Sequence, residues 1–424
     1  MPLNVGTIYS TLGNSNSLIP LAVKDFAATG GMTAGSYVTG KEEGFDRFID
    51  EIGTEFIWLF GIPLFKKLFD LVGFKAAKMD SKFDARNLKN KDIFNKIKEY
   101  APTEEIKKDI EKIGKKQKLF KGLVMSKFVV STALTVGTYI GLTKFKQNYT
   151  AKKIRQNLID EYNAKKNGEE NKKNSNNPAF KGLGSAIEGF VFSPVKNMWI
   201  LDGCITGERL KDSRTPQEFV GYGIKEASTL CFMYYAGGKI QELAEKHAKK
   251  KYNKTIGIDA RIIEDGSLKK VFDDGSIEKS LNKFSAVKGK PLDIYEFLHK
   301  NPDNFIVKSA KKSDIIKMYK DTNKIDTRKY IDLQEVESLN NKLSELYSQY
   351  KKALKNGETS EQFFKGVKKL KRSSIRLNIG SCIFALGVMT PAMMLLKRFT
   401  DKDGAEFRTK DEIRKQLIKE GIIS

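Results

Sequence analysis

The sequence contains few of the residues that build disulfide frameworks and metal centres. Its 424 residues include only 3 cysteines, 2 histidines and 2 tryptophans. The cysteines, Cys204, Cys231 and Cys382, lie far apart and form no Cys-x-x-Cys pair, which argues against a disulfide scaffold and a structural zinc site. His247 and His299 each fall in the last turn of an expected helix, and we expect neither to be catalytic.

Arginine is also scarce, although the chain is strongly basic. The net charge of +24 arises from 76 Lys and Arg residues against 52 Asp and Glu residues, and only 12 of the 76 are Arg. Proteins that read bases favour Arg, because its planar guanidinium forms paired hydrogen bonds. An excess of Lys is typical of solubility or of a general attraction to anionic surfaces. Nucleic-acid binding is therefore an alternative rather than the first expectation.

Motifs that hold phosphates or dinucleotides are incomplete. Residues 35–41, GSYVTGK, match most of a phosphate-binding loop, but Glu42 stands where Ser or Thr would hold magnesium. Gly182 and Gly184 lack the third glycine of a dinucleotide fingerprint, because that position is Ile187. We therefore predict no catalytic, cofactor-binding or metal-binding residues.

What the chain does contain is a weak internal similarity. Shifted by 175 positions, residues 43–86 align without gaps on residues 218–261, with nine identities in 44 positions. At a shift of 250, Ser131 meets Ser381 and Gly137 meets Gly387. The pattern predicts a tandem duplication whose second copy carries an insertion. The expected segments are an N-terminal segment (1–29), a first copy (30–150), a polar linker (151–178), a second copy (179–400) and a charged C-terminal helix (401–424).

Polar residues that recur in both halves are the signature of this repeat. We expect structural roles for them, as hydrogen bonds between packed helices, ion pairs or helix caps. A cation site at a pseudo-two-fold axis, as in duplicated transporters, is the alternative. They are Glu51, Thr54, Asp84 and Arg86 in the first half, and Glu226, Thr229, Asp259 and Arg261 in the second.

Hydrophobic spacing predicts a mainly α-helical fold. Residues 43–74 follow a helical stripe that Gly61-Ile62-Pro63 interrupts, and residues 330–356 have apolar residues three and four positions apart. Helix 330–356 packs against its own domain or contacts another protein. Near 256–280, Asp-Gly pairs separate short apolar runs, which predicts a small β-hairpin inside the inserted segment.

Two stretches are apolar enough to enter a membrane. Residues 377–396 contain no charge over about 30 Å of helix, and residues 122–143 contain one lysine. A basic cluster precedes each stretch, and its residues are candidates for contact with anionic lipid. They are Lys115, Lys116, Lys118 and Lys121, then Lys368, Lys369, Lys371, Arg372 and Arg376. The mean hydropathy of −0.43 keeps a soluble helical bundle open as the alternative.

These patterns together predict a membrane-associated structural or interaction protein without catalytic activity. It would dock to the cytoplasmic face of the membrane through two units, each a basic cluster followed by an apolar helix. Membrane lipids are its expected partners. The alternatives are a soluble, Lys-rich nucleic-acid-binding protein and a small transporter-like repeat protein.

Overall fold

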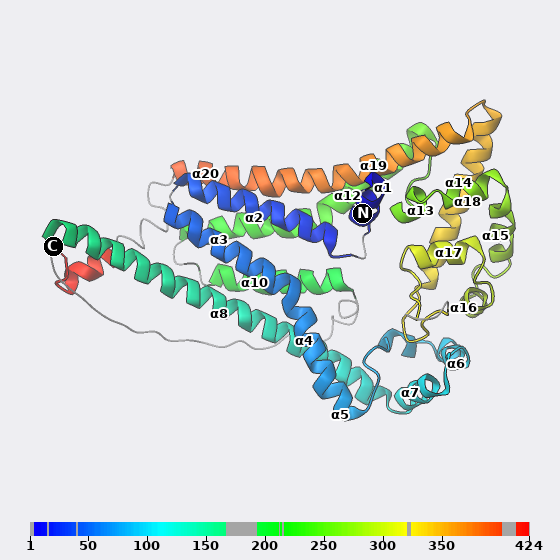
Figure 1. The fold of residues 1–424 in the computed structure, drawn as a ribbon, viewed down its shortest axis with the longest axis horizontal. Coiled ribbons are helices and arrows are strands. Elements are labelled where there is room, and N and C mark those ends of the chain that lie inside the picture. Colours follow the sequence, from blue (N-terminus) through cyan, green and yellow to red (C-terminus); the bar gives the residue numbers. More distant parts are fainter. Residues whose placement is uncertain are drawn as a thin grey trace. The chain divides into compact units, whose positions relative to one another are not determined.

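The protein is mainly α-helical (Figure 1). The computed structural model describes residues 4–14, 17–39, 41–166, 193–211, 213, 216–319, 324–400 and 413–423. Within these ranges there is no β-strand, and Met318 and Ile325 form an isolated bridge. The predicted fold class is thus confirmed at the level of mainly helical structure.

The chain divides into two compact units. Unit 1 comprises Met1–Leu21, Lys66–Val130 and Tyr235–Ser381. Unit 2 comprises Ala22–Phe65, Ser131–Tyr234 and Cys382–Ser424. Long helices such as α8 (Gln117–Lys166) and α19 (Ser360–Phe384) contribute residues to both units.

Unit 2 is made of long helices that run alongside one another (Figure 1). α11 packs against α10, η5 and α20. Besides parts of α8 and α19, the elements are α2 (Ile19–Thr39), α3 (Lys41–Phe56), the π turn η1 (Ile57–Gly61), the start of α4 (Ile62–Phe69), α10 (Pro194–Lys211), α11 (Pro216–Cys231), the π turn η4 (Phe232–Ala236), the π turn η5 (Ala385–Met389) and α20 (Thr390–Thr400).

Small residues let the helices of unit 2 approach closely. On α2, Ala27 and Gly31 lie one turn apart and face Gly387 of η5. A Cβ atom added at Gly31 would overlap the carbonyl oxygen of Gly387, so any larger residue there would force the backbones apart. A Cβ atom added at Gly53 would lie 2.5 Å from the Leu142 side chain of α8. Such small-residue contacts are common between membrane helices, although they also occur elsewhere.

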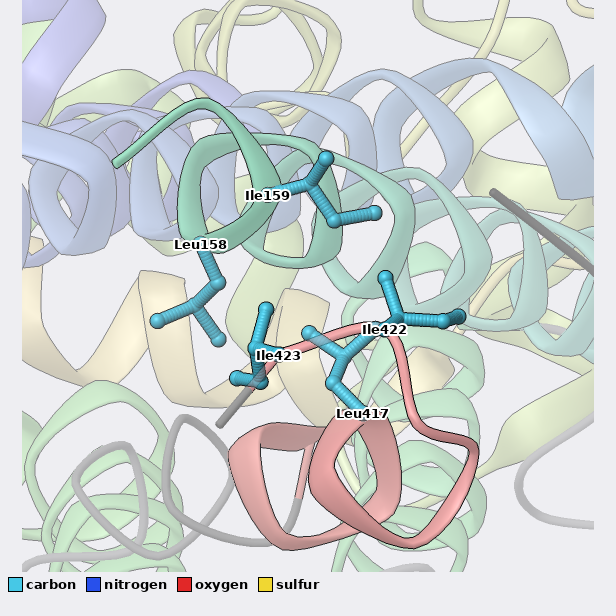
Figure 2. Packing of buried hydrophobic residues seen from close by; sticks show 5 residues of the cluster. All are labelled: Leu158, Ile159, Leu417, Ile422 and Ile423. Atoms are coloured by element: carbon cyan, nitrogen blue, oxygen red, sulfur yellow. The ribbon is translucent and has the colours of Figure 1, made fainter. Parts of the chain in front are cut away.

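The C-terminal segment covers one end of α8. Residues 413–419 are helical, and Figure 2 shows Leu417, Ile422 and Ile423 packing against Leu158 and Ile159 of α8. Arg155 of α8 adds an ion pair of 2.7 Å with Glu420.

Residues 401–412 of the predicted tail helix and residues 167–178 of the predicted linker lie outside the described residues, whereas 151–166 continue α8.

Unit 1 consists mostly of short helices around an apolar core. α18 provides its longest amphipathic face, with Val336, Leu343 and Leu346 fully buried. α18 contacts α15, α16 and α17, so its apolar stripe is covered inside the unit. Besides parts of α4, α8 and α19, the elements are α1 (Val5–Leu12), the π turn η2 (Asp70–Phe74), α5 (Lys75–Ala77), the 3-10 turn η3 (Ala85–Leu88), α6 (Lys91–Glu99), α7 (Glu104–Lys115), α12 (Gly237–Tyr252), α13 (Ala260–Glu264), α14 (Ser267–Asp273), α15 (Ser276–Ser285), α16 (Pro291–Lys300), α17 (Phe305–Lys312) and α18 (Leu333–Lys355).

The β-hairpin predicted near 256–280 is wrong, because this segment forms the helices α13, α14 and α15. Gly266 and Gly275 of the two Asp-Gly pairs have positive φ angles of 83° and 72°, but each turn joins two helices. Between the turns, Leu268 and Phe272 repeat at helical spacing, and both are buried in the core. The turn residues were recognised correctly, and the elements on either side were not.

The segments that align at a shift of 175 residues have matching local structure. α3 begins at Lys41 and α11 at Pro216, and the π turns η1 and η4 occupy 57–61 and 232–236. Further along, α5 and α12 each end on a left-handed residue, Lys78 with φ 50° and Asn253 with φ 49°. Each of these features recurs 175 residues later, and η1 ends at Gly61, the first residue of the interruption seen in the sequence.

Candidate functional site: a charged interior in unit 2

Charged side chains gather in the interior of unit 2. Among the described residues, only three buried charged residues belong to unit 1, and they are Lys254, Asp326 and Lys371. Removing an ion from water costs several kcal/mol even after relaxation, so a concentration of buried ions requires specific partners. The buried charged residues of unit 2 are Lys24, Asp50, Glu51, Glu55, Glu208, Arg209, Lys225 and Glu226.

Arg209 of α10 has the most partners in this interior. Its guanidinium forms a short ion pair with Glu226 of α11, and one nitrogen lies 3.5 Å from the Asp50 carboxylate of α3. It also donates to the hydroxyl oxygens of Tyr139, at 2.8 Å, and Thr54, at 3.3 Å. Arg209 thus joins α3, α8, α10 and α11, which is possible because its planar head presents several donors at once.

Lys225 of α11 forms the second bridge. Its ammonium donates to both carboxylate oxygens of Glu51 on α3, at 2.7 and 2.9 Å. The same nitrogen lies 3.5 Å from the neighbouring Glu226. Together with Asp50 and Arg209, these residues form the interior charge cluster. Its three carboxylates and two cations leave it formally negative.

A pair of carboxyl groups lies in the same interior. Glu55 of α3 accepts a hydrogen bond from the Thr29 hydroxyl of α2 at 3.0 Å, and its carboxyl also contacts the carboxyl of Asp25. Both Asp25 and Glu55 interact with the charge on Glu51. A further carboxylate, Asp202 of α10, accepts a short hydrogen bond from the Tyr234 hydroxyl of η4.

Three of the repeat-signature residues meet in this interior. Glu51, Thr54 and Glu226 are connected through Arg209 and Lys225, whereas Thr229 is half-buried on α11. Cross-helix contacts of this kind let the two aligned segments pack on each other through charged residues.

The remaining repeat-signature residues lie in unit 1, where they form helix caps and ion pairs, including one between Arg261 and Asp314. Asp84 caps η3 by accepting the Arg86 backbone N–H at 3.0 Å, and it forms an ion pair of 2.7 Å with the Arg86 side chain. Asp259 and Arg261 repeat the arrangement at α13, at 2.8 Å for each contact. Neither pair points to a ligand.

The two basic clusters differ in exposure. Lys115, Lys116, Lys118 and Lys121 are all exposed. In the second cluster, Lys371 is buried against Glu245 at 2.8 Å, and Arg372 forms two bonds of 2.7 Å with Glu264. Lys369 and Arg376 are exposed, and Lys368 is half-buried. The first cluster therefore offers more charge to an anionic surface than the second.

Both histidines belong to unit 1 and take no part in the interior charge cluster. His247 is exposed on α12. His299, in the last turn of α16, stacks on Tyr100 with the ring centres 4.3 Å apart. Burial, together with a smaller effect of the charge on Lys311, lowers the pKa of His299 to about 4. The imidazole is thus neutral at physiological pH, contrary to the cation expected at a helix C-terminus.

Sequence reasoning missed Lys24, Asp25, Glu55, Arg209 and Lys225. One feature pointed to the first two, because Lys24 and Asp25 are the only charged residues between positions 17 and 40. Charges inside such an apolar helix usually face an interior and have a function. Nothing comparable marks Arg209 or Lys225, because many charged residues surround them in the sequence.

Comparisons of the chain with protein families, with curated proteins and with solved structures find no match. Any proposal about function therefore depends on the physical features of the two units.

Proposed function

We propose that the chain is a membrane-associated structural or interaction protein, held in the bilayer by unit 2. The single observation that carries this proposal is the polarity of unit 2, which has charged residues inside and large apolar side chains outside. Such an arrangement is unfavourable in water and favourable in lipid. The exposed apolar residues include Phe26, Phe48, Phe56, Phe60, Leu134, Phe145, Trp199, Phe219, Phe384, Val388, Met393 and Leu396.

Two helices are long and apolar enough to cross a bilayer. They are Gln117–Phe145 in α8 and Ser360–Met393 in α19, η5 and α20. Only 22% and 39% of their most apolar windows are buried. The core helix of a soluble protein passes the same test of length and composition, but such a helix is mostly covered by its own fold. The low coverage of both helices supports contact with lipid.

We further propose that the two halves are copies of one ancestral unit. In each copy a helical segment with a π turn, η1 or η4, lies before a long apolar helix, α8 or α19. The recurrence of the π turns, the left-handed helix ends and the Asp-x-Arg caps at one common shift supports this origin. Internal repeats are a frequent architecture of membrane transporters.

The interior charge cluster favours one second candidate, a transporter-like repeat protein. Ionisable groups buried between helices in a membrane commonly mark ion or proton pathways. Here Glu51 of the first copy and Glu226 of the second share Lys225, so the charges lie where the copies meet.

Fractionation of cells that produce the full chain tests the membrane proposal. Membranes are washed first at low salt, then at high salt and alkaline pH, and finally dissolved in detergent. We expect the protein to stay with the membranes until detergent is added. Recovery in the soluble fraction at low salt would refute the proposal. Release by salt alone would show binding through the basic clusters without insertion of α8 or α19.

A further inference from the structure

We propose that Asp25 and Glu55 hold one proton between their carboxyl groups and so form a proton-binding site inside unit 2. The site lies on α2 and α3, next to residues of α10 and α11. The inference goes beyond the proposed membrane role, because it concerns the interior of unit 2 and does not depend on what surrounds that unit.

The first argument is a missing hydrogen-bond donor. Glu55 is only 3% exposed, and its Oε1 atom accepts from the Thr29 hydroxyl at 3.0 Å. Its Oε2 atom is buried and receives no hydrogen bond from any N–H or O–H group that the structure describes. A buried acceptor without a donor is unfavourable by about 1–3 kcal/mol, and more when it carries a charge.

The second argument is the neighbour of that carboxyl group. The Asp25 carboxyl lies within hydrogen-bonding reach of Glu55. Two ionised carboxylates offer acceptors alone and repel each other. When one of them carries a proton, the O–H group donates to the other carboxylate, and the pair satisfies itself.

The surrounding charges do not remove the need for a proton. Facing the pair are three more carboxylates, namely Glu51 of α3, Asp202 of α10 and Glu226 of α11. The cation that faces Asp25 is Lys225, which already donates to both oxygens of Glu51. Full ionisation of the pair would therefore add charge to a region that is already negative.

A proton fits this place better than a metal ion. Within the described residues, no group of three or more His, Cys, Asp and Glu side chains is placed to hold a metal. A divalent ion usually requires several ligands around one point, whereas a proton requires two oxygens in line. The Asp25 and Glu55 carboxyls supply that simpler arrangement.

Infrared spectroscopy of the full chain in detergent tests this site. A protonated carboxylic acid has a carbonyl band that is separate from carboxylate bands and moves in D₂O. We expect this band at neutral pH in the unmodified protein and its loss at alkaline pH. Glu55→Gln and Asp25→Asn each keep the shape of the side chain and supply an N–H donor in place of the proton. Each should remove about one carboxylic acid's share of the band.

Asp326→Asn is the control, because Asp326 is a buried carboxylate of unit 1 that lies outside the pair and whose two oxygens both accept hydrogen bonds from Arg328. This substitution should leave the band at its original size. The site is refuted if the unmodified protein has no such band at neutral pH, or if the band is unchanged in both Glu55→Gln and Asp25→Asn. Absence of the band is measured on the unmodified protein. The proposal can therefore be refuted even if both variants fail to fold. The infrared test does not use membrane fractionation. The proposed proton site and the proposed membrane association can therefore be refuted independently.

Discussion

Units 1 and 2 differ in what they bury. Unit 1 has an aromatic and aliphatic core in which Phe272 packs edge-on against Tyr347 and Phe364, with ring centres 5.1 and 5.5 Å apart. Many of its ion pairs lie near the surface, such as Lys269 with Asp273. Unit 2 instead encloses Arg209, Lys225 and their carboxylates, and it exposes phenylalanines. The interior of unit 2 therefore combines ion-paired groups with apolar residues such as Trp58 and Leu201, whereas the interior of unit 1 is mostly apolar.

This difference indicates that unit 1 is suited to water and unit 2 to lipid. In water, burial of apolar side chains supplies most of the stability, and unit 1 follows that rule. Unit 2 exposes many of its apolar side chains and holds its helices together with ion pairs and small-residue contacts, which is an effective arrangement when lipid covers the outside. Three predictions test this contrast, beginning with the largest effect.

Removing the central cation of unit 2 should have the largest effect. Arg209→Met leaves Glu226 and Asp50 without their shared partner, and loss of one member of a buried ion pair typically costs about 3–5 kcal/mol. Arg155→Met is the matched control, because the Arg155–Glu420 pair is partly exposed and worth about 1 kcal/mol or less. Denaturation in detergent micelles measures both. Equal losses of stability in the two variants would contradict the view that the ion pairs of Arg209 stabilise the interior of unit 2.

A charge placed on the apolar surface should distinguish the two units. Leu134 of α8 in unit 2 is 48% exposed, and Leu354 of α18 in unit 1 is 41% exposed. Leu134→Asp should oppose membrane insertion by about 3 kcal/mol if lipid covers this face. Leu354→Asp should change little, since substitutions on a surface in water usually stay within about 0.5 kcal/mol. The membrane-bound fraction after alkaline washing provides the measurement, and identical behaviour of both variants would place the face of Leu134 in water.

Unit 1 should lose stability in mild acid through His299. Burial lowers the pKa of His299 in the folded protein to about 4, while an unfolded histidine titrates near 6.5. Between these values the unfolded chain binds more protons, so stability falls as the pH decreases from 6.5 towards 4. The loss at pH 5 should be roughly 2 kcal/mol.

The variant His299→Phe isolates this effect, because phenylalanine keeps the ring between Tyr100 and Tyr295 without a titrating group. Its stability should fall less than that of the unmodified protein between pH 6.5 and 5. The control is His247→Gln, which changes the other histidine, an exposed residue, and should retain the full acid dependence. Parallel pH profiles of His299→Phe and the unmodified protein would disprove the role of His299.

Helices could be predicted from the sequence where one face of the helix is apolar. The stripe through Leu339, Leu343 and Leu346 predicted α18, because this helix buries that face in its own unit. The same logic failed near Leu268 and Phe272, where the turn residues suited both a hairpin and a helix connection. In apolar runs this short, the two-residue spacing of a strand cannot be distinguished from the three- to four-residue spacing of a helix.

The candidate site could be predicted only in part. Comparison of the two halves of the chain singled out Glu51 and Glu226, since they recur at one common shift. Arg209 has no identical counterpart at this shift, where the first half has Ala34. Its importance depends on three-dimensional contacts with α3, α8 and α11, which no spacing in the sequence reveals.

The C-terminal residues that pack on the end of α8 are synthesised much later than that end. Leu158 and Ile159 leave the ribosome long before Leu417, Ile422 and Ile423, the residues that pack on them (Figure 2). At about 5–20 residues per second, this apolar patch waits on the order of tens of seconds for its partner. During that time an assisting protein or the membrane itself would have to cover the patch. The closing of this cover is thus one of the last steps in the maturation of unit 2.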